Sequence, residues 1–461
     1  MLRLQETNER INANTGLTSV GLLLQDISFG NRECHGNGIS DHDVLMSMTG
    51  LLCQGQVHYE DIENYREDPA FSAMLGLSRV PSSSLLCQRM NHLGDDAASH
   101  ARLEAVNTTL LSSQVMGACT IGNDQYIPVD IDVSPMDNGG SKREHVGRTY
   151  KGCDGFAPIF AYIGTEGWLL HHELRPGIQH CQKDTPAFIE ACFEQLESLQ
   201  LTHPVCVRLD SGNDSADTLA VLRTSKYHFI VKRNRRLEDK AQWLETARSL
   251  GDPTTQRPGK DVYTGTVDHL VPGGNNSVQE SLTVVYRVVH RTIDKHGQHL
   301  LIPTIEVETY WTNLWYNPVD IIACYHKRGT CEQFHSELKT DIGIERLPSY
   351  AFGTNQLCLR LASIAYNTLR IIGVLANQAR NDWPKLIKSV QRRRLRSIIK
   401  DLILVGGKYI RHAGATLLKV NKHNLWCGVL MSINMLENFL KMLLENTLTA
   451  LMLLIFLYIA G

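Results

Sequence analysis

The segment from 126 to 133 (YIPVDIDV) alternates two kinds of side chain, and this pattern restricts the fold more than any other feature. Isoleucine and valine occupy one face, whereas Asp130 and Asp132 share the other. Period-two alternation is typical of a β-strand. An acid on the inner face of a sheet is costly unless it is paired or bound to a metal. The segment is therefore either an edge strand with solvated acids or a central strand at a cation site.

The residues that follow predict more strands separated by helices. Two apolar runs indicate a hairpin, and two further short strands each lie next to a helical run. Such an order predicts a mixed sheet flanked by helices, an α/β core in a chain that is α+β overall. The predicted segments are a hairpin at 156–164 and 167–177, helices at 184–200 and 214–223, and strands at 204–210 and 227–233.

The length and these patterns divide the 461 residues into five regions. A helix-turn-helix is possible in the first region around Val80-Pro81-Ser82, which makes it a possible DNA-binding part; simple helix packing is the alternative. The regions are a helical N-terminal domain at 1–115, the first part of the core at 116–234, a β-rich insertion at 235–300, the second part of the core at 301–380, and a basic, then apolar helical region at 381–461.

The C-terminal end is unusually apolar. No charged residue follows Glu445, and 447–461 is almost entirely hydrophobic. This run is shorter than the ~20 residues that span a bilayer. A buried terminal helix is the favoured interpretation. Sequence that replaces a natural end is the second interpretation, and a membrane anchor is the third.

Asp210 ends a predicted strand and is followed by Ser-Gly-Asn. In open α/β sheets, ligands gather at the carboxyl ends of strands. A turn or helix-capping role is the alternative. Together with Asp132 and an acid on a later helix, Asp210 can supply the carboxylate oxygens that Mg²⁺ and Mn²⁺ prefer. Two such ions can activate a nucleophile and stabilise the leaving oxygen of a phosphodiester.

Tyr325, Arg328, Glu332 and Lys339 are spaced for one face of a helix. At about 100° per residue, all four lie within about 40° of Glu332, whereas Glu337 points away. One acid is then flanked by two cations and a phenol, which suits a site for a metal and a polyanion. Arginine can grip phosphate with its planar fork, and lysine adds a point charge. An ordinary i,i+4 ion pair between Arg328 and Glu332 is the alternative.

Two basic clusters are further candidates for contact with phosphate, although charge runs are usually solvated faces. The residues are Lys232, Arg233 and Arg235 after a predicted strand, and Arg392, Arg393 and Arg394 near the C-terminal end. The formal net charge of the whole chain is −2, so nucleic-acid binding has to use such local patches. The twelve cysteines include no C-x2-C pair, which argues against a structural zinc module and fits a reducing cytosol.

Three of these segments resemble the DDE transposases of bacterial insertion sequences. The superfamily is defined by the signature Y-x2-R-x3-E-x6-K, which matches YHKRGTCEQFHSELK at 325–339. DIDVSPMDNGG at 130–140 and VRLDSGNDS at 207–215 are similar to its first-acid and second-acid regions. The resemblance covers about residues 40–410, and the apolar tail does not share it.

The resemblance implies an RNase H-like catalytic core with three metal-binding catalytic acids, Asp132, Asp210 and Glu332. Asp130 is the alternative first acid, but Asp132 is preferred because it lies in an Asp-x-Ser sequence similar to the family's. The separations along the chain, 210 − 132 = 78 and 332 − 210 = 122, fit a family with a β-rich insertion before the last acid.

The resemblance also implies the reaction and its partners. Tyr325, Arg328 and Lys339 match positions that contact the transferred DNA end. The implied activity is cut-and-paste transposition, with Mg²⁺ or Mn²⁺ as the cofactor and no small-molecule cofactor. The expected partners are double-stranded DNA, as terminal inverted repeats and target, and a second copy in a homodimer, with no membrane. The expected location is the bacterial cytoplasm, at the nucleoid when bound to DNA.

Two other functions remain open on the sequence. The apolar tail is compatible with a catalytically decayed transposase that only binds DNA, although all three acids are present. An RNase H-fold nuclease without strand transfer is the other alternative. The cations around Glu332 disfavour it, because simple hydrolysis does not require the cut end to be held.

Overall fold

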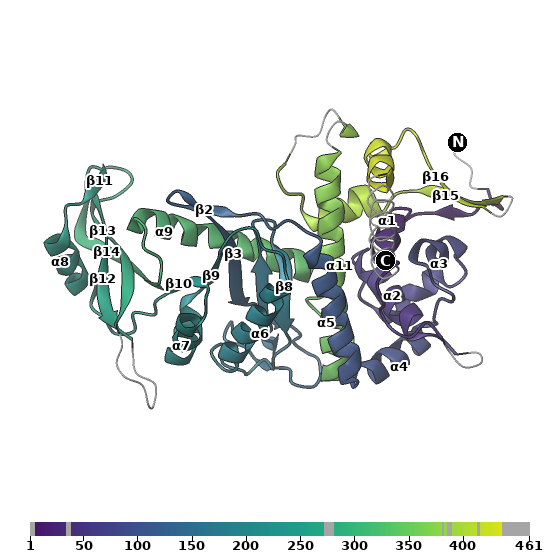
Figure 1. Cartoon of the computed structure of the whole chain (residues 1–461), viewed down its shortest axis with the longest axis horizontal. Coiled ribbons are helices and arrows are strands. Elements are labelled where there is room, and N and C mark those ends of the chain that lie inside the picture. Colours follow the sequence, from purple (N-terminus) through teal and green to yellow (C-terminus); the bar gives the residue numbers. More distant parts are fainter. Residues whose placement is uncertain are drawn as a thin grey trace, which may run out of the picture. The chain divides into compact units, whose positions relative to one another are not determined.

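The computed structural model describes residues 5–33, 38–271, 281–379, 382–384, 390–412 and 415–435 (Figure 1). The apolar tail, including all three interpretations of it, lies outside these residues. The chain forms two compact units. We call Met1–Leu110, Lys142–Glu144 and Ser336–Gly461 the helical unit, and Leu111–Ser141 with His145–His335 the sheet unit.

The sheet unit is built on a ten-stranded mixed sheet, as the sequence predicts. Its order is β11-β12-β13-β14-β10-β9-β3-β7-β8, with β2 on β3. The pairs β3–β9 and β9–β10 are parallel, and the other pairs are antiparallel. The strands are β2 (Cys119–Ile121), β3 (Asp124–Val133), β7 (Ile159–Ile163), β8 (Trp168–Glu173), β9 (Val205–Leu209), β10 (His228–Lys232), β11 (Thr254–Arg257), β12 (Lys260–Leu270), β13 (Ser281–Ile293) and β14 (His299–Thr312).

The acid-bearing strand β3 is central, not an edge strand, because β9 and β7 flank it. Its aliphatic residues are buried, and the predicted hairpin is confirmed by the antiparallel pairing of β7 with β8. A small sheet of order β4-β6-β5 lies in the loop between β3 and β7. Its strands are β4 (Met136–Asp137), β5 (Gly147–Arg148) and β6 (Asp154–Phe156).

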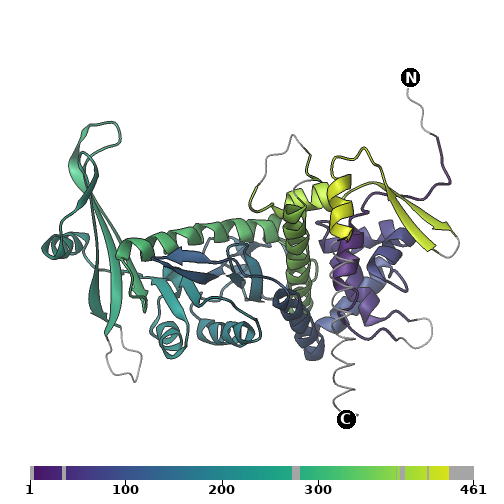
Figure 2. The ribbon, with the colours of Figure 1, turned by 45° about the horizontal axis from the view of Figure 1, so that its top comes forward.

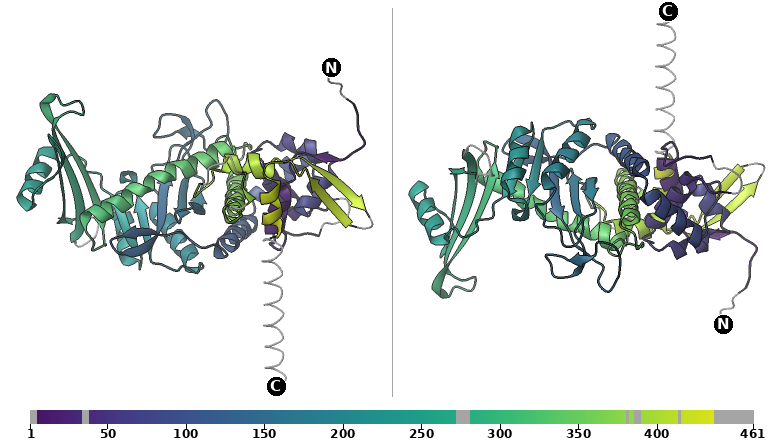
Figure 3. Two further views of the ribbon diagram at one scale, coloured as in Figure 1. Left: turned by 90° about the horizontal axis from the view of Figure 1, so that it is seen from above. Right: turned by 90° about the horizontal axis from the view of Figure 1, so that it is seen from below.

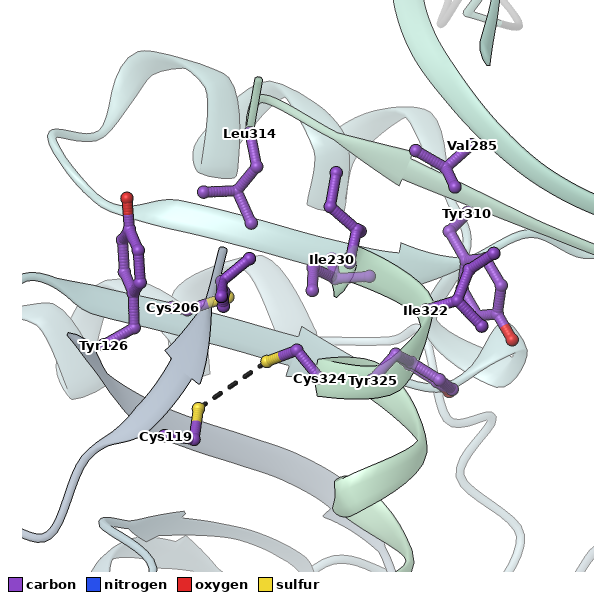
Figure 4. Packing of buried hydrophobic residues seen from close by; sticks show 12 residues of the cluster. Cys119, Tyr126, Cys206, Ile230, Val285, Tyr310, Leu314, Ile322, Cys324 and Tyr325 are labelled. Atoms are coloured by element: carbon purple, nitrogen blue, oxygen red, sulfur yellow. Dashed lines mark hydrogen bonds between the residues drawn. The ribbon is translucent and has the colours of Figure 1, made fainter. Parts of the chain in front are cut away.

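Helices cover both faces of the central sheet (Figures 2 and 3). The helix α9 crosses one face, and α6 and α7 lie on the other. Figure 4 shows how side chains of α9 pack on β2, β3, β9 and β10 through one apolar cluster, which includes Cys324 and Tyr325. The helical segments of this unit are α6 (Thr185–Glu197), η2 (Ser211–Asn213), α7 (Ala216–Thr224), α8 (Lys240–Leu250), α9 (Pro318–His326), η3 (Lys327–Thr330) and α10 (Cys331–Ser336).

The predicted β-rich insertion extends the main sheet rather than forming a separate one. The long strands β12, β13 and β14 continue it beyond β10, because β14 pairs with β10. The helix α8 packs on these strands through Trp243, Leu244 and Ala247. The insertion therefore adds strands to one end of the main sheet and leaves the pairing of β10, β9 and β3 unchanged.

The helical unit surrounds one long helix, α11. By length and composition alone, α11 could cross a membrane. However, 89% of its most hydrophobic stretch is buried inside the protein, as in a core helix. Ser40 caps the N-terminus of α2, because its side-chain oxygen accepts a hydrogen bond from the backbone N–H of Asp43. The helical segments are α1 (Leu17–Leu24), α2 (Asp41–Leu52), η1 (Tyr59–Tyr65), α3 (Pro69–Leu75), α4 (Ser83–Gly94), α5 (Ala97–Ser112, ending in the sheet unit), η4 (Glu337–Asp341), α11 (Phe352–Gln378), α12 (Leu395–Ile398) and η6 (Ile399–Ile403).

The region predicted as basic and helical from 381 onward is only partly helical where it is described. Two strands, β15 (Gly407–His412) and β16 (Ala415–Val420), form a hairpin that pairs with β1 (Ile11–Asn12). The prediction of helix was wrong for these two strands, because their pairing with each other and with β1 is a tertiary contact that local composition does not show.

Candidate active site

Asp132 and Asp210 lie side by side at the carboxyl ends of β3 and β9. The two strands pair in parallel, with Ile131 opposite Leu209, so the next positions are Asp132 and Asp210. Neighbouring strands are about 4.8 Å apart, and residues in register point to the same face. The fold therefore brings together two acids that are 78 residues apart in the chain.

Asp132 is held by two basic side chains. Arg328 Nη2 is 3.3 Å from Asp132 Oδ1 and also donates to the carbonyl oxygen of Ile131 at 2.8 Å. His335 Nε2 is 3.5 Å from Asp132 Oδ2. Burial opposes ionisation of Asp132, but the hydrogen bond from His335 and the charge of Arg328 outweigh it, so the pKa is below its ordinary value. Asp132 is thus maintained as a carboxylate.

Asp210 is in the opposite electrostatic situation. Burial and the nearby charge of Asp132 raise its pKa, and this outweighs the opposing effects of Arg328 and of a 2.8 Å hydrogen bond from Asn213. The pKa of Asp132 is therefore lowered and that of Asp210 is raised. When both carboxylates are ionised, their negative charges repel each other. A cation between them would relieve this repulsion.

Asp130, the alternative first acid, has a structural role. Its two oxygens accept bonds of 2.6 and 2.7 Å from Arg208, and both side chains are almost fully buried. Arg208 also donates to the carbonyl oxygen of Cys324 at 2.6 Å. This ion pair links β3, β9 and the end of α9. Because Asp130 is engaged in it, Asp132 is the acid available beside Asp210.

We predict that Asp130→Asn lowers the free energy of unfolding by about 2–3 kcal/mol, because Arg208 loses a buried, doubly hydrogen-bonded carboxylate. Chemical denaturation of the purified protein measures this. Asp154→Asn is the control, since Asp154 forms an exposed pair with Arg148 at 3.4 Å that is worth at most about 1 kcal/mol. Equal effects of the two substitutions would contradict the bracing role.

The helix that carries Glu332 is not regular. A 3₁₀ turn, η3, interrupts it before α10, and a π turn, η4, follows. The predicted common face at 100° per residue is therefore wrong. Arg328 pairs with Asp132, not with Glu332. Glu332 is exposed on the first turn of α10, and within the described parts of the chain its carboxylate has no hydrogen-bond or ion-pair partner.

The two other signature residues differ in their surroundings. Tyr325 is buried in the apolar cluster against Tyr310, with ring centroids 4.7 Å apart (Figure 4). Burial raises its pKa strongly, and Asp210 adds to this effect. Lys339, in the helical unit, lies 3.2 Å from Glu345. Contact of either residue with DNA stays a prediction.

A family match agrees with this arrangement of acids. The family described as "Transposase DDE domain group 1" matches residues 28–438, most of the chain. The chain belongs to the DDE transposases. This transposase is also similar to a solved structure, the piggyBac transposase synaptic complex with hairpin DNA. The identity is 10%, the TM-score is 0.40, and the match covers 85% of this chain and 76% of that one. No curated protein matches the sequence.

The first basic cluster of the transposase is partly used for packing. Arg233 is buried, pairs with Glu238 at 2.7 Å and stacks over Trp311 at 4.6 Å. Lys232 and Arg235 are half-buried. The structure thus favours a packing role for Arg233, whereas the proposed phosphate contacts of Lys232 and Arg235 stay predictions.

The second basic cluster is engaged in ion pairs within the helical unit. Glu337 is fully buried and accepts hydrogen bonds from Arg370 and Arg392. Arg393 is buried against Asp401, and Arg394 pairs with Asp341 at 2.8 Å. These contacts favour a structural role for Arg392 and Arg393 over phosphate binding. The cluster was predicted to contact phosphate because sequence spacing does not reveal its acidic partners.

Sequence reasoning missed three residues around the acids of the transposase. His335 and Cys331 lie one helical turn apart on α10 and face Asp132. The hydroxyl of Tyr150 donates to the carbonyl oxygen of Val133 at 3.0 Å, and burial followed by the charges of Asp132 and Asp210 raises its pKa. The Cys-x3-His spacing inside the signature was the one available signal for the pair on α10.

The donor set fits a hard divalent cation. Asp132 and Asp210 offer carboxylate oxygens from adjacent strand ends, which Mg²⁺ and Mn²⁺ prefer. Burial and the charge of Asp132 raise the pKa of Asp210, and a bound cation would favour its ionised form. Asp132 and Asp210 are therefore the residues that would hold the metal expected for this transposase family.

Proposed function

We propose that the chain cleaves DNA at the ends of a mobile element and joins those ends to a target, in cut-and-paste transposition. The observation that carries the proposal is the register of β3 and β9, which sets Asp132 beside Asp210 in a chain of the DDE transposase family. We propose Glu332 as the third acid, because it lies on the helix whose other residues contact Asp132.

The residues divide the work at the site. A bound divalent ion, Mg²⁺ or Mn²⁺, supplies an activated oxygen nucleophile and stabilises the leaving oxygen. Asp132 and Asp210 would hold it, His335 and Arg328 favour the ionised form of Asp132, and Asn213 orients Asp210. Because the acids act as ligands rather than nucleophiles, no covalent enzyme intermediate is expected. Arg328 is also placed to meet a phosphate that approaches Asp132.

We further propose an RNase H-like core formed by β8-β7-β3-β9-β10. Two antiparallel pairings on one side of β3 and two parallel pairings on the other support this, together with acids at the ends of β3 and β9. The proposed context is a bacterial insertion sequence. The proposed partners are its terminal inverted repeats, target DNA and a second copy of the chain, in the cytoplasm.

The proposal is tested by incubating the purified full chain with DNA that carries its own element ends and either Mg²⁺ or Mn²⁺. Nicked ends followed by strand-transfer products are expected. End binding without cleavage at any metal concentration would instead support a decayed, DNA-binding copy. Hydrolysis without strand transfer would support an RNase H-fold nuclease.

We predict that Glu332→Gln reduces cleavage by at least about 100-fold and leaves the free energy of unfolding within about 0.5 kcal/mol. The reason is that the Glu332 carboxylate is exposed, so its charge matters for the site and little for folding. Gel assays of cleavage and chemical denaturation check the two parts. Glu190→Gln changes an exposed acid on α6 and should alter neither. Full activity of Glu332→Gln would remove Glu332 from the proposed triad.

A further inference from the structure

Three metal-ligating side chains of different chemistry meet at one point of the sheet unit. Asp132, Cys331 and His335 each offer one ligand atom, and these atoms all lie within 4.8 Å of one another. The distance from His335 Nε2 to Cys331 Sγ is 3.5 Å, and that from His335 Nε2 to Asp132 Oδ2 is 3.5 Å. Cys331 and His335 are at positions i and i+4 of α10, so they project from one face of the helix.

We propose that Asp132, Cys331 and His335 bind Zn²⁺. In a tetrahedral zinc site the ligand atoms lie about 2.0–2.3 Å from the metal, which places them roughly 3.3–3.7 Å from each other. The two 3.5 Å separations already match this spacing. A thiolate and an imidazole select zinc, whereas Mg²⁺ favours oxygen ligands alone. Three protein ligands leave a fourth position for water.

The surroundings preorganise these ligands. The hydroxyl of Tyr162 is 3.3 Å from His335 Nδ1, which fixes the ring and directs Nε2 towards Asp132. Cys331 and His335 are buried, with 1% and 6% of their surface exposed. Arg328 is a positive charge that opposes a cation, but it contacts Oδ1 of Asp132 and leaves Oδ2 to the site.

Zinc at this position would compete with the proposed catalytic metal for Asp132. This consequence, unlike zinc binding itself, rests on the proposed function. A chain that holds Zn²⁺ between β3 and α10 cannot offer the same carboxylate freely to Mg²⁺. We therefore expect micromolar zinc to inhibit cleavage and excess Mg²⁺ to relieve the inhibition only partly, because zinc has ligands that Mg²⁺ does not use.

Zinc binding is tested without DNA and without catalysis. The metal-free full chain is titrated with Co²⁺, and a thiolate-to-cobalt charge-transfer band is followed; Zn²⁺ is then added to displace the cobalt. We expect the band in the wild type, its loss in Cys331→Ser, and its retention in Cys192→Ser, which alters a buried thiol on α6. Retention of the band in Cys331→Ser, or its absence in the wild type, would overturn the proposal.

A second variant tests the site independently, in case Cys331→Ser does not fold. Asp132→Asn changes a partly exposed side chain without changing its size, and we expect at least about 100-fold weaker zinc binding in competition with a chromophoric chelator. Unchanged zinc affinity in a folded Asp132→Asn protein would also refute the site. If zinc binds as described but cleavage is unaffected by it, the zinc site stands and the role of Asp132 in the proposed reaction fails.

Discussion

Replacing Asp210 with asparagine is expected to lower DNA cleavage by at least about 1,000-fold, because a charged carboxylate ligand of the proposed metal is replaced by a neutral amide. In the absence of divalent ions, the same change is expected to stabilise the fold. Burial and the charge of Asp132 raise the pKa of Asp210, so its ionised form costs stability at neutral pH. That cost disappears as the pH falls through the raised pKa, and asparagine removes it at every pH.

Thermal unfolding with and without Mg²⁺ checks the second half of this prediction. Without metal, Asp210→Asn should melt a few degrees above the wild type. With metal, the wild type should gain stability and the variant should not. Asp217→Asn, an exposed acid on α7, is the control and should show no such reversal. A variant that melts below the wild type in metal-free buffer would show that Asp210 is compensated by a partner other than a cation.

Replacing Glu337 with alanine is expected to lower the free energy of unfolding by about 3–5 kcal/mol. Its carboxylate is fully buried and is shared by Arg370 and Arg392, so its removal leaves one buried and one partly buried guanidinium group without their acid. Arg370 is buried as completely as Glu337 and has a lowered pKa, for which burial and then the charge of Arg392 are responsible. Glu337 accepts hydrogen bonds from both arginines and so compensates their positive charges.

Chemical denaturation of the full chain measures this loss. The control is Glu9→Ala, which removes an exposed pair with Lys408 of the same unit and should cost at most about 1 kcal/mol. A loss below about 1 kcal/mol for Glu337→Ala would mean that the two arginines reach other acceptors or water. Arg392 would then be available for the phosphate contact that its sequence position first suggested.

The sequence predicts the sheet and two of the acids well, for a physical reason. Alternation in β3 and an apolar run in β9 identify the strands, and parallel strands place their carboxyl ends at one edge. That rule predicts an acid of β3 beside Asp210, but it does not choose between Asp130 and Asp132. The preference for Asp132 over Asp130 came from the resemblance, and the buried partner of Asp130, Arg208, was hidden because the pairing crosses two strands.

The helical signature was predicted less well, because its turns depart from the regular α-helix. The 3₁₀ turn rotates Arg328 away from its expected angle relative to Glu332, and Lys339 lies on a π turn rather than on a regular α-helix. Composition also misled the interpretation of Arg392 and Arg393, whose acidic partners lie elsewhere in the chain. Local periodicity carries no information about such long-range partners.

The ion pair of Asp130 and Arg208 has a mechanical consequence. Arg208 ties two adjacent strands to the last turn of α9, from which Arg328 follows within four residues. The wall beside the acids is therefore stiff, since shifting it would separate a desolvated charge pair. If DNA binds beside these acids as proposed, it meets a wall of fixed shape, and any mutual adjustment is expected to fall mainly on the nucleic acid.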